Sequence, residues 1–452
     1  MTKPSLPQGM RDFSAETIRK RNHIFNTIKN VFENYGFEPL ETPAMENLDT
    51  LMGKYGEEGD RLIFKVLNNG LNDPKNAEKA KDGFEKATQG KSSPLLTERA
   101  LKYDLTIPFA RFVAMNYGQL TFPYKRYQIQ QVWRADRPQK GRYREFTQCD
   151  ADVVGSSNLI NEVELAGVYH SVFTKLGLGN YILKINSRKI LSSLAEMCGS
   201  NELLTDITIA IDKLDKIGIE KVKAELEQRG LNSLQIGLIE NYLNISGSNT
   251  EKLNKITELL DNTGASEGKS ELAFVLNHCE KYNIEIDFTL ARGLNYYTGI
   301  IFEVKAPLNV QMGSIGGGGR YDNLTELFGV PNVPGVGISF GVDRIYDVME
   351  ELKLFPENLQ SGIQAIFFNM GEKESLFAYK IMQQVRDNGI SCEMFHEFTK
   401  MEKQFKYADK KNINFAIIIG SKEIEEKNAV VKNLKTGVQE NIGFGELVEY
   451  LK

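Results

Sequence analysis

Residues Tyr124 to Val154 predict a long β-hairpin. Apolar and polar side chains alternate on both sides of a basic loop, in which Pro138 and Gly141 favour a reversal of the chain. Side chains two positions apart on a strand share a face, so one face of the second strand carries three hydrogen-bonding groups. These are Gln148, Asp150 and Asp152.

The loop of this hairpin is strongly basic, although the chain as a whole has a net charge of −5. Its cations are Arg134, Arg137, Lys140, Arg142 and Arg144. Arginines near the tip and acidic or amide groups deeper down suit a ligand that is anionic at one end and cationic at the other. The alternative is a solvated hairpin whose arginines pair with the aspartates. Unpaired guanidinium groups match phosphate, which favours a ligand site.

The length and composition predict a soluble protein of several domains. With 452 residues, 41% of them hydrophobic, the chain can form two or three ordinary cores. The sequence has no apolar leader and no run long enough to cross a bilayer, so we expect a cytoplasmic protein without a membrane partner. The four cysteines lie far apart and there are four histidines, so we expect neither disulfides nor a protein-built metal site.

The remaining sequence divides into segments of different periodicity. We expect a helix at 14–36, an exposed polar insertion at 67–94, and a strand followed by a helix at 93–118. Residues 187–280 read as helices, whereas strands return at 288–304, 313–324 and 335–341. The pattern after Pro356 is α/β, with a linker at 358–362.

Three further elements carry arginines that we expect around one cavity with the hairpin. Arg292 precedes Tyr296 and Tyr297, which would point to opposite faces of a strand, so that one of them could belong to the core. Glycines 316–319 would let a flat ring or a phosphate approach the backbone before Arg320. Arg344 falls in the first turn of a helix and needs an anionic partner, for which a surface salt bridge is the alternative. The predicted set is Arg134, Arg142, Arg292, Arg320 and Arg344.

No Ser-His-Asp or Cys-His arrangement accompanies these arginines. The sequence therefore favours electrostatic catalysis on phosphates over a nucleophilic side chain.

These motifs resemble those of the class II aminoacyl-tRNA synthetases, and specifically the histidyl-tRNA synthetases. YGFEPLETPAMEN, which contains Pro43, is similar to motif 1, RPQKGRYREF to motif 2 and GISFGVDR to motif 3. ARGLNYYTGIIFE and GGGGRYD resemble two signatures of the histidine enzymes. The resemblance covers nearly the whole chain.

The resemblance implies an α+β fold with the antiparallel-sheet catalytic core of class II synthetases, a helical insertion and a C-terminal α/β anticodon-binding domain. We expect the core at 1–186 and 281–357, the insertion at 187–280 and the anticodon-binding domain at 361–452. A homodimer formed partly through motif 1 is also implied.

The resemblance further implies that ATP and L-histidine form histidyl-adenylate, from which histidine is transferred to tRNA(His). By this analogy Arg134 and Arg292 are catalytic and hold the α-phosphate from two sides, while Arg142 and Arg344 hold the γ-phosphate. Magnesium is expected on the β- and γ-phosphates. The residues implied for histidine are Asp104, Thr106 and Gln148 at the ammonium group, Asp152 and Tyr297 at the imidazole, and Tyr296.

Contacts with tRNA are expected at two places. Arg137 and Gln139 in the motif 2 loop have donors for the acceptor end. Lys403, Lys406 and Lys410 share one face of a predicted helix, which is either a phosphate-binding surface or an ordinary solvated face.

Some positions depart from one common form of the family pattern. Asp104 and Asp152 stand where some members have glutamate, Lys102 where arginine is frequent, and Asn295 where aspartate is frequent.

Two alternative functions would require other sequence features. A non-catalytic, synthetase-like regulatory subunit of histidine biosynthesis lacks the terminal domain and usually loses catalytic arginines. A class II synthetase for another amino acid would have no reason to combine Asp152 and Tyr297 with RGLNYYTG.

Overall fold

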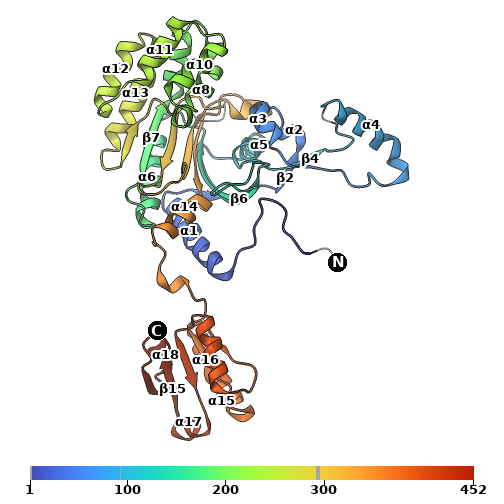
Figure 1. Ribbon diagram of the computed structural model, residues 1–452, viewed down its shortest axis with the longest axis vertical. Coiled ribbons are helices and arrows are strands. Elements are labelled where there is room, and N and C mark those ends of the chain that lie inside the picture. The colour runs from blue at the N-terminus through green and yellow to red at the C-terminus, as the bar shows by residue number, and fades with distance from the viewer. Residues whose placement is uncertain (1–2, 92, 292–295) are drawn as a thin grey trace. The chain divides into compact units, whose positions relative to one another are not determined.

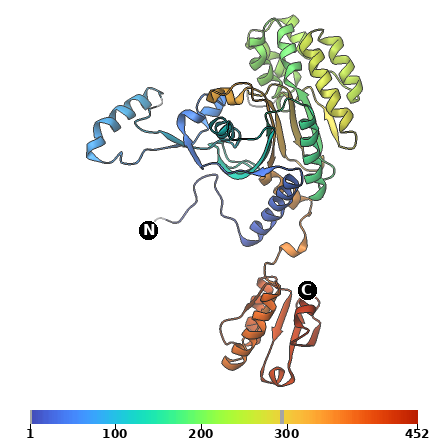
Figure 2. The same ribbon diagram turned by 180° about the vertical axis from the view of Figure 1, so that it is seen from behind.

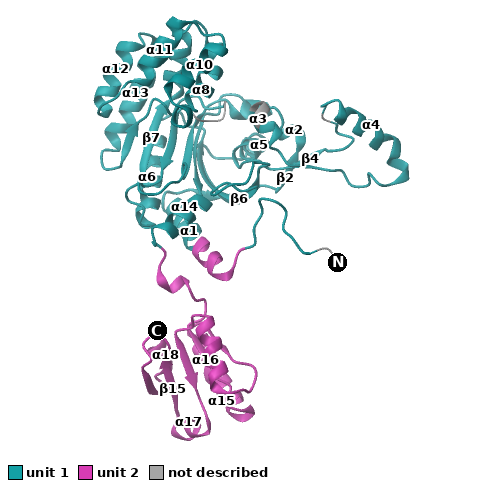
Figure 3. Ribbon diagram, viewed as in Figure 1, with its two compact units in different colours: residues 1–12, 23–354 teal, residues 13–22, 355–452 magenta. Residues whose placement is uncertain are grey.

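The structure is a computed structural model that describes residues 3–91, 93–291 and 296–452. The chain forms two compact units, which are described separately (Figure 3). Unit 1 comprises residues 1–12 and 23–354, and unit 2 comprises residues 13–22 and 355–452.

A largely antiparallel sheet forms the centre of unit 1. Within the described residues it has eight strands, and its two edge strands pair in parallel with their neighbours. In spatial order these are β1 (Glu38–Pro39), β5 (Tyr124–Trp133), β6 (Glu145–Val154), β11 (Gly335–Gly341), β10 (Gly316–Tyr321), β9 (Ile300–Lys305), β7 (Ile182–Ser187) and β8 (Ile284–Ile286). Strands β5 and β6 confirm the predicted hairpin, and the sheet confirms the predicted α+β class.

One face of this sheet carries the aromatic core. Phe340 of β11 packs against Phe32 of α1 (Ala15–Asn34) and against Tyr169 and Phe173 of α6 (Ile160–Lys175), with ring centroids 4.9–5.8 Å apart. Helix α14 (Val342–Glu351) follows β11 directly, as predicted. The side chains of β6 and β11 that point away from this core lie on the opposite face of the sheet.

A small three-stranded sheet and short helices border that opposite face. The sheet contains β2 (Met45–Asn47), β4 (Arg99–Leu101) and β3 (Lys65–Val66), and the helices are α2 (Leu48–Leu51), α3 (Gly56–Arg61), α5 (Thr106–Asn116) and the 3₁₀ turn η3 (Leu324–Phe328). Strand β4 followed by α5 confirms the strand-helix prediction for 93–118. A second core lies here, with Ile107, Phe109 and Val113 of α5 fully buried.

The polar segment at 67–94 is exposed, as predicted, but it also contains a helix. A 3₁₀ turn, η1 (Pro74–Asn76), leads into α4 (Ala77–Thr88), which projects from the body of unit 1 (Figure 1). Ala80 and Gly83 are its buried residues, and Gly83 lies against Leu96.

Helices gather at the β7 end of the sheet, as views from both sides show (Figure 1, Figure 2). They are α7 (Arg188–Met197), η2 (Asn201–Leu203), α8 (Leu204–Ile211), α9 (Leu214–Ile217), α10 (Ile219–Gln228), α11 (Ser233–Leu243), α12 (Asn249–Leu259) and α13 (Thr263–His278). Asn232 and Ser248 form capping boxes that start α11 and α12. The helical reading of 187–280 is confirmed, while the domain boundaries stay a prediction.

Unit 2 has the predicted α/β pattern around a sheet that is five-stranded within the described residues. Its strands in spatial order are β13 (Cys392–Met394), β12 (Ala365–Phe367), β14 (Phe415–Ile418), β15 (Asn428–Asn433) and β16 (Gln439–Gly443). Its further elements are η4 (Glu357–Leu359), α15 (Glu372–Asp387), α16 (Met401–Lys410), α17 (Ser421–Glu426) and α18 (Leu447–Leu451). Across the described parts of both units, no helix is long and apolar enough to cross a membrane.

Candidate active site

A cavity of about 370 Å³ lies on the face of the large sheet opposite the aromatic core. Strands β6, β10 and β11 contribute to its lining, together with the hairpin loop and the first residues of α5 and α14. Of the predicted site residues, nine line it. These are Asp104, Thr106, Arg134, Arg142, Gln148, Asp152, Tyr296, Tyr297 and Arg344.

Arg134 is held in a fixed orientation at the end of β5. Its Nε donates to the carbonyl oxygen of Tyr103 at 3.0 Å, and its Nη2 donates to Oε1 of Gln148 at 3.4 Å. The guanidinium also lies 4.3 Å from the centre of the Tyr103 ring, where a cation–π attraction holds it. These contacts orient a half-buried cation at the cavity wall.

Two more arginines lie near the hairpin loop. Arg344 donates from Nε to the Gly141 carbonyl at 3.0 Å and from Nη1 to the Ser314 carbonyl at 2.6 Å. Arg142 is exposed, and its Nη1 lies 3.5 Å from Oδ1 of Asp136. The cavity therefore has a basic end made by the hairpin loop and the start of α14.

Three buried carboxylates form the opposite, acidic end. Asp104, Asp150 and Asp152 are 2%, 3% and 3% exposed. Tyr55 donates its hydroxyl to Oδ1 of Asp104 at 2.8 Å, and Tyr321 donates to Oδ1 of Asp152 at 2.5 Å. Burial raises the pKa of all three carboxyls, and that of Asp150 to about 7.

Arg126 was missed in the sequence analysis. Its Nη2 lies 2.8 Å from Oδ2 of Asp152, and its guanidinium, which is fully buried, stacks 4.1 Å from the centre of the Phe109 ring. The register of the hairpin places Arg126 directly opposite Asp152. Pairing the two predicted strands residue by residue from the loop would have revealed this contact.

Tyr296 and Tyr297 both line the cavity, so the prediction that they face opposite sides of a strand is wrong. The reason is that β9 begins only at Ile300, and the two tyrosines lie in the segment before it. Their rings pack edge to face with centroids 5.0 Å apart.

Two glycines make room for these groups. A Cβ on Gly337 would lie 1.9 Å from Oδ1 of Asp152, and a Cβ on Gly319 would lie 2.9 Å from Cδ1 of Tyr297. The flat ring that lies against the glycine cluster is therefore that of Tyr297, and the approach of a ligand's ring or phosphate to these glycines stays a prediction.

Two family models match the greater part of the chain. A family model for histidyl-tRNA synthetase matches residues 95–345, and one for an anticodon-binding domain matches residues 364–452. The chain belongs to the histidyl-tRNA synthetase family. The histidine--tRNA ligases of Christiangramia forsetii and Bacteroides fragilis strain YCH46 are 50% and 51% identical to it. The alignments cover 100% and 99% of this chain and 99% and 98% of those proteins.

Solved structures of similar fold include the histidyl-tRNA synthetase of Nostoc sp. PCC 7120. It has a TM-score of 0.83 and 31% identity, with 100% of this chain and 99% of that chain covered. A Bacillus halodurans protein described as an ATP phosphoribosyltransferase regulatory subunit/histidyl-tRNA synthetase has a TM-score of 0.73 at 19% identity, covering 93% of this chain and 99% of that chain. The latter shows likeness of fold alone.

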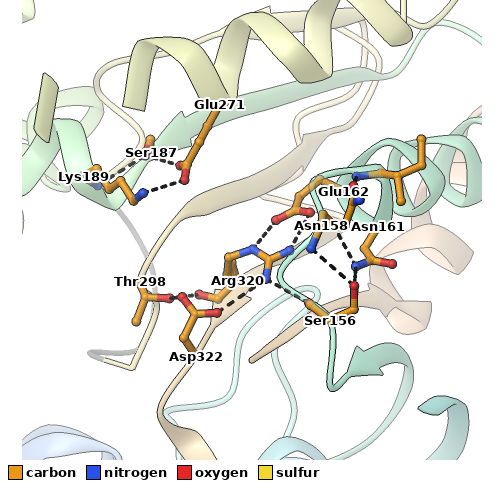
Figure 4. A network of polar contacts seen from close by, with 11 residues as sticks. Ser156, Asn158, Asn161, Glu162, Ser187, Lys189, Glu271, Thr298, Arg320 and Asp322 are labelled. Carbon is orange, nitrogen blue, oxygen red and sulfur yellow. Dashed lines mark hydrogen bonds and ion pairs between the residues drawn. The ribbon is translucent and has the colours of Figure 1, made fainter. Parts of the chain in front are cut away.

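Arg320 does not line the cavity of this histidyl-tRNA synthetase family member, which corrects its predicted place there. Figure 4 shows its guanidinium between Glu162 and Asp322. Nε lies 2.5 Å from Oε1 of Glu162 and Nη2 lies 2.8 Å from Oε2, while Nη1 donates to the Ser156 carbonyl. Both groups of the ion pair are almost completely buried, so Arg320 connects β10 to the start of α6.

Five of the remaining predicted residues have exposed side chains, and one lies outside the described residues. Arg137 and Gln139 lie at the tip of the hairpin, where Gln139 and Arg142 form a β-bridge. Lys403 and Lys410 are exposed on α16. Lys406 on the same helix is exposed too, and pairs with Glu402 at 2.7 Å. Arg292 and Asn295 lie outside the described residues.

Proposed function

We propose that the chain ligates L-histidine to tRNA(His) in two steps, by way of histidyl-adenylate formed from ATP. The observation that carries the proposal is one cavity with arginines at one end and buried carboxylates at the other. Such a cavity suits simultaneous binding of an anionic nucleotide and a cationic amino acid. Membership of the histidyl-tRNA synthetase family and the full-length likeness to histidine--tRNA ligases support it.

ATP would occupy the basic end. Arg134 would hold the α-phosphate, and Arg142 and Arg344 the γ-phosphate, with Arg292 on the other side of the α-phosphate. No cluster of His, Cys, Asp or Glu side chains able to hold a metal occurs among the described residues. Magnesium, which the family resemblance implies, would neutralise part of the charge on the β- and γ-phosphates of ATP.

The histidine ammonium group would be bound at Asp104. Its Oδ2 atom is buried and has no hydrogen-bond partner among the described residues, so an ammonium donor would satisfy it. Thr106 and Gln148, which also line the cavity, would bind the same group. Gln148 is positioned for this by donating Nε2 to Oγ of Ser339 at 3.1 Å.

The imidazole would be read by Asp152 and Tyr297, with Tyr296 beside them. Asp152 is fixed from two sides by Tyr321 and Arg126. A buried site that must hydrogen-bond its substrate rejects analogues without the polar group by up to ~10⁴-fold, so selection of histidine needs no editing step.

The chemistry requires no catalytic base for the first step. The histidine carboxylate is already a nucleophile and attacks the α-phosphorus, and pyrophosphate leaves. The guanidinium of Arg134 stabilises the charge that develops on the α-phosphate oxygens, because it is oriented before the reaction begins. In the second step a terminal ribose hydroxyl of the tRNA attacks the carbonyl carbon, and AMP leaves.

The tRNA would contact two surfaces. Arg137 and Gln139 would meet the acceptor end at the hairpin tip. On α16 the contact would be with Lys403, Lys406 and Lys410. A homodimer formed partly around Pro43 and a cytoplasmic location are further parts of the proposal.

Pyrophosphate exchange with each amino acid in turn tests this function. We expect exchange of label into ATP with histidine alone, followed by charging of tRNA(His). A regulatory subunit would bind histidine without exchange, and a synthetase of another specificity would exchange with a different amino acid. Either result would refute the proposal.

A further inference from the structure

Asp150, the third carboxylate of the acidic end, has no ligand contact assigned to it in the function proposed above. It lies on β6 between Gln148 and Asp152, and its register partners are Gln128 on β5 and Ser339 on β11. Asp150 lines the cavity although its side chain is almost completely buried. It is therefore positioned to influence the binding of a ligand at the acidic end of the cavity.

Asp150 and Gln128 form a cross-strand pair in which two acceptor atoms lack donors. Oδ1 of Asp150 and Oε1 of Gln128 are both buried without a hydrogen-bond partner among the described residues. Gln128 uses its amide nitrogen for Oγ1 of Thr42 at 2.8 Å and Oε1 of Gln130 at 2.5 Å, so it has no donor to offer Asp150. The missing hydrogen bond must come either from a proton on Asp150 or from a donor group of the ligand.

The charges that face Asp150 come from several elements. Arg126 on β5 favours its ionised form, whereas Asp152 on β6 and Asp104 ahead of α5 oppose it. Burial is the largest effect and raises the pKa of Asp150 to about 7. Ser339 also hydrogen-bonds its carboxyl. Other titratable groups that interact with it are Lys102, Tyr169 and Tyr297.

We propose that Asp150 is a further substrate-binding residue of the histidine site, which holds the ammonium group of histidine more strongly when the Asp150 carboxylate is ionised. Arg126 is fully buried and its ion pair is with Asp152, so Oδ1 of Asp150 stays open to a donor on the ligand. Binding of the ammonium group releases the proton of Asp150 to solvent. Histidine affinity therefore rises with pH across the ionisation of Asp150. This inference rests on the proposed function.

The test compares Asp150→Asn with the wild-type full chain in pyrophosphate exchange. We expect the ratio of the two histidine KM values, variant over wild type, to rise from near one at pH 6 to about tenfold at pH 7.5. Taking the ratio cancels the titration of histidine itself. Burial lowers the pKa of Lys102 to about 8, so pH 7.5 is the upper limit of the comparison. The KM for ATP should be the same in both proteins.

Glu303 provides a matched control, because it also lines the cavity but pairs with Lys305 at 2.6 Å. Glu303→Gln should change the histidine KM by the same factor at both pH values. If the asparagine variant does not fold, as judged by circular dichroism, Asp150→Ser removes the same charge with a smaller side chain.

A KM ratio that is constant with pH would show that Asp150 has only a structural role and would overturn the inference. So would a loss confined to the KM for ATP. In both cases histidine-dependent exchange by the wild type would leave the proposed function standing. Absence of that exchange in the wild type would instead refute the proposed function, and this inference with it.

Discussion

Asp150→Asn should stabilise the free protein, by an amount that grows with pH. Burial raises the pKa of Asp150 from its ordinary value of 3.8 to about 7, so the folded chain binds this proton more tightly than the unfolded chain does. A group with a raised pKa contributes stability that is fully present below pH 3.8 and is lost as the pH rises to about 7. Asparagine has a similar shape and carries no charge, so the variant avoids this loss.

The size of the effect follows from the same two pKa values. Each pH unit between them costs the wild type about 1.4 kcal/mol, which amounts to about 4 kcal/mol at pH 7 and above. The difference in the free energy of unfolding between variant and wild type should therefore widen from pH 5 to pH 7 and then level off.

Fluorescence of Trp133 during urea unfolding is the assay. It is the one tryptophan of the chain and lies at the end of β5, so it reports on the sheet that contains Asp150. Histidine must be left out of the buffer. Unfolding curves whose separation does not change between pH 5 and pH 8 would refute the reasoning.

Asp287 is a control, because its pKa is shifted downward whereas that of Asp150 is shifted upward. Burial acts to raise its pKa, but the hydrogen bonds from Lys184 and Thr289, together with the charge of Lys184, outweigh burial and the net shift is downward. Its stabilising contribution is present above the ordinary pKa of 3.8 and is lost only as the pH falls further. Asp287→Asn should therefore be less stable than wild type by the same amount at every pH from 5 to 8.

Three further predictions concern activity. Arg134→Ala should lower pyrophosphate exchange by ~10²- to 10³-fold with an unchanged circular dichroism spectrum, because one preorganised charge contact is lost; near-normal exchange would contradict its role. Asp152→Ala should raise the KM for histidine far more than that for ATP, and the reverse would mean that Asp152 is misassigned. Replacing Lys403, Lys406 and Lys410 together should raise the KM for tRNA and reduce the log–log salt slope by about one unit per lost phosphate contact. An unaltered slope would make this helix face an ordinary solvated surface.

The hairpin shows how much the sequence could predict. The alternation of polar and apolar side chains over residues 124–154 predicted both strands and the shared face of Gln148, Asp150 and Asp152. Such an alternation can be recognised from neighbouring residues alone. The pairing of Arg126 with Asp152 depends on register, which the length of the loop decides. It could be worked out from the sequence only after the two ends of the loop were known.

Arg320 shows that the presence of an arginine in a motif does not by itself predict that its side chain lines the cavity. Five arginines on neighbouring motifs suggested a single cluster around the cavity. On β10, however, Gly319 and Tyr321 are on the side of the strand that faces the cavity, where they lie against Tyr297 and Asp152. Arg320 stands between these two residues in the sequence. Its side chain therefore points to the other side of β10, toward Glu162. Residue type correctly suggested a charged contact for Arg320, but the side of the strand on which it lies decided that the contact is with Glu162.

The helix in the 67–94 insertion could not be predicted for a different reason, because its polar composition is equally typical of a loop.

The glycine at position 337 limits how this pocket could be redesigned for another amino acid. Alanine scanning finds important residues by removing atoms, whereas here the smallest possible addition, one methyl group, would occupy the place of the Asp152 carboxylate. Libraries that vary only the residues with side chains in the cavity would leave this restriction in place. A side chain can be added at position 337 only if residue 152 becomes smaller at the same time, because the added atoms would otherwise meet the Asp152 carboxylate.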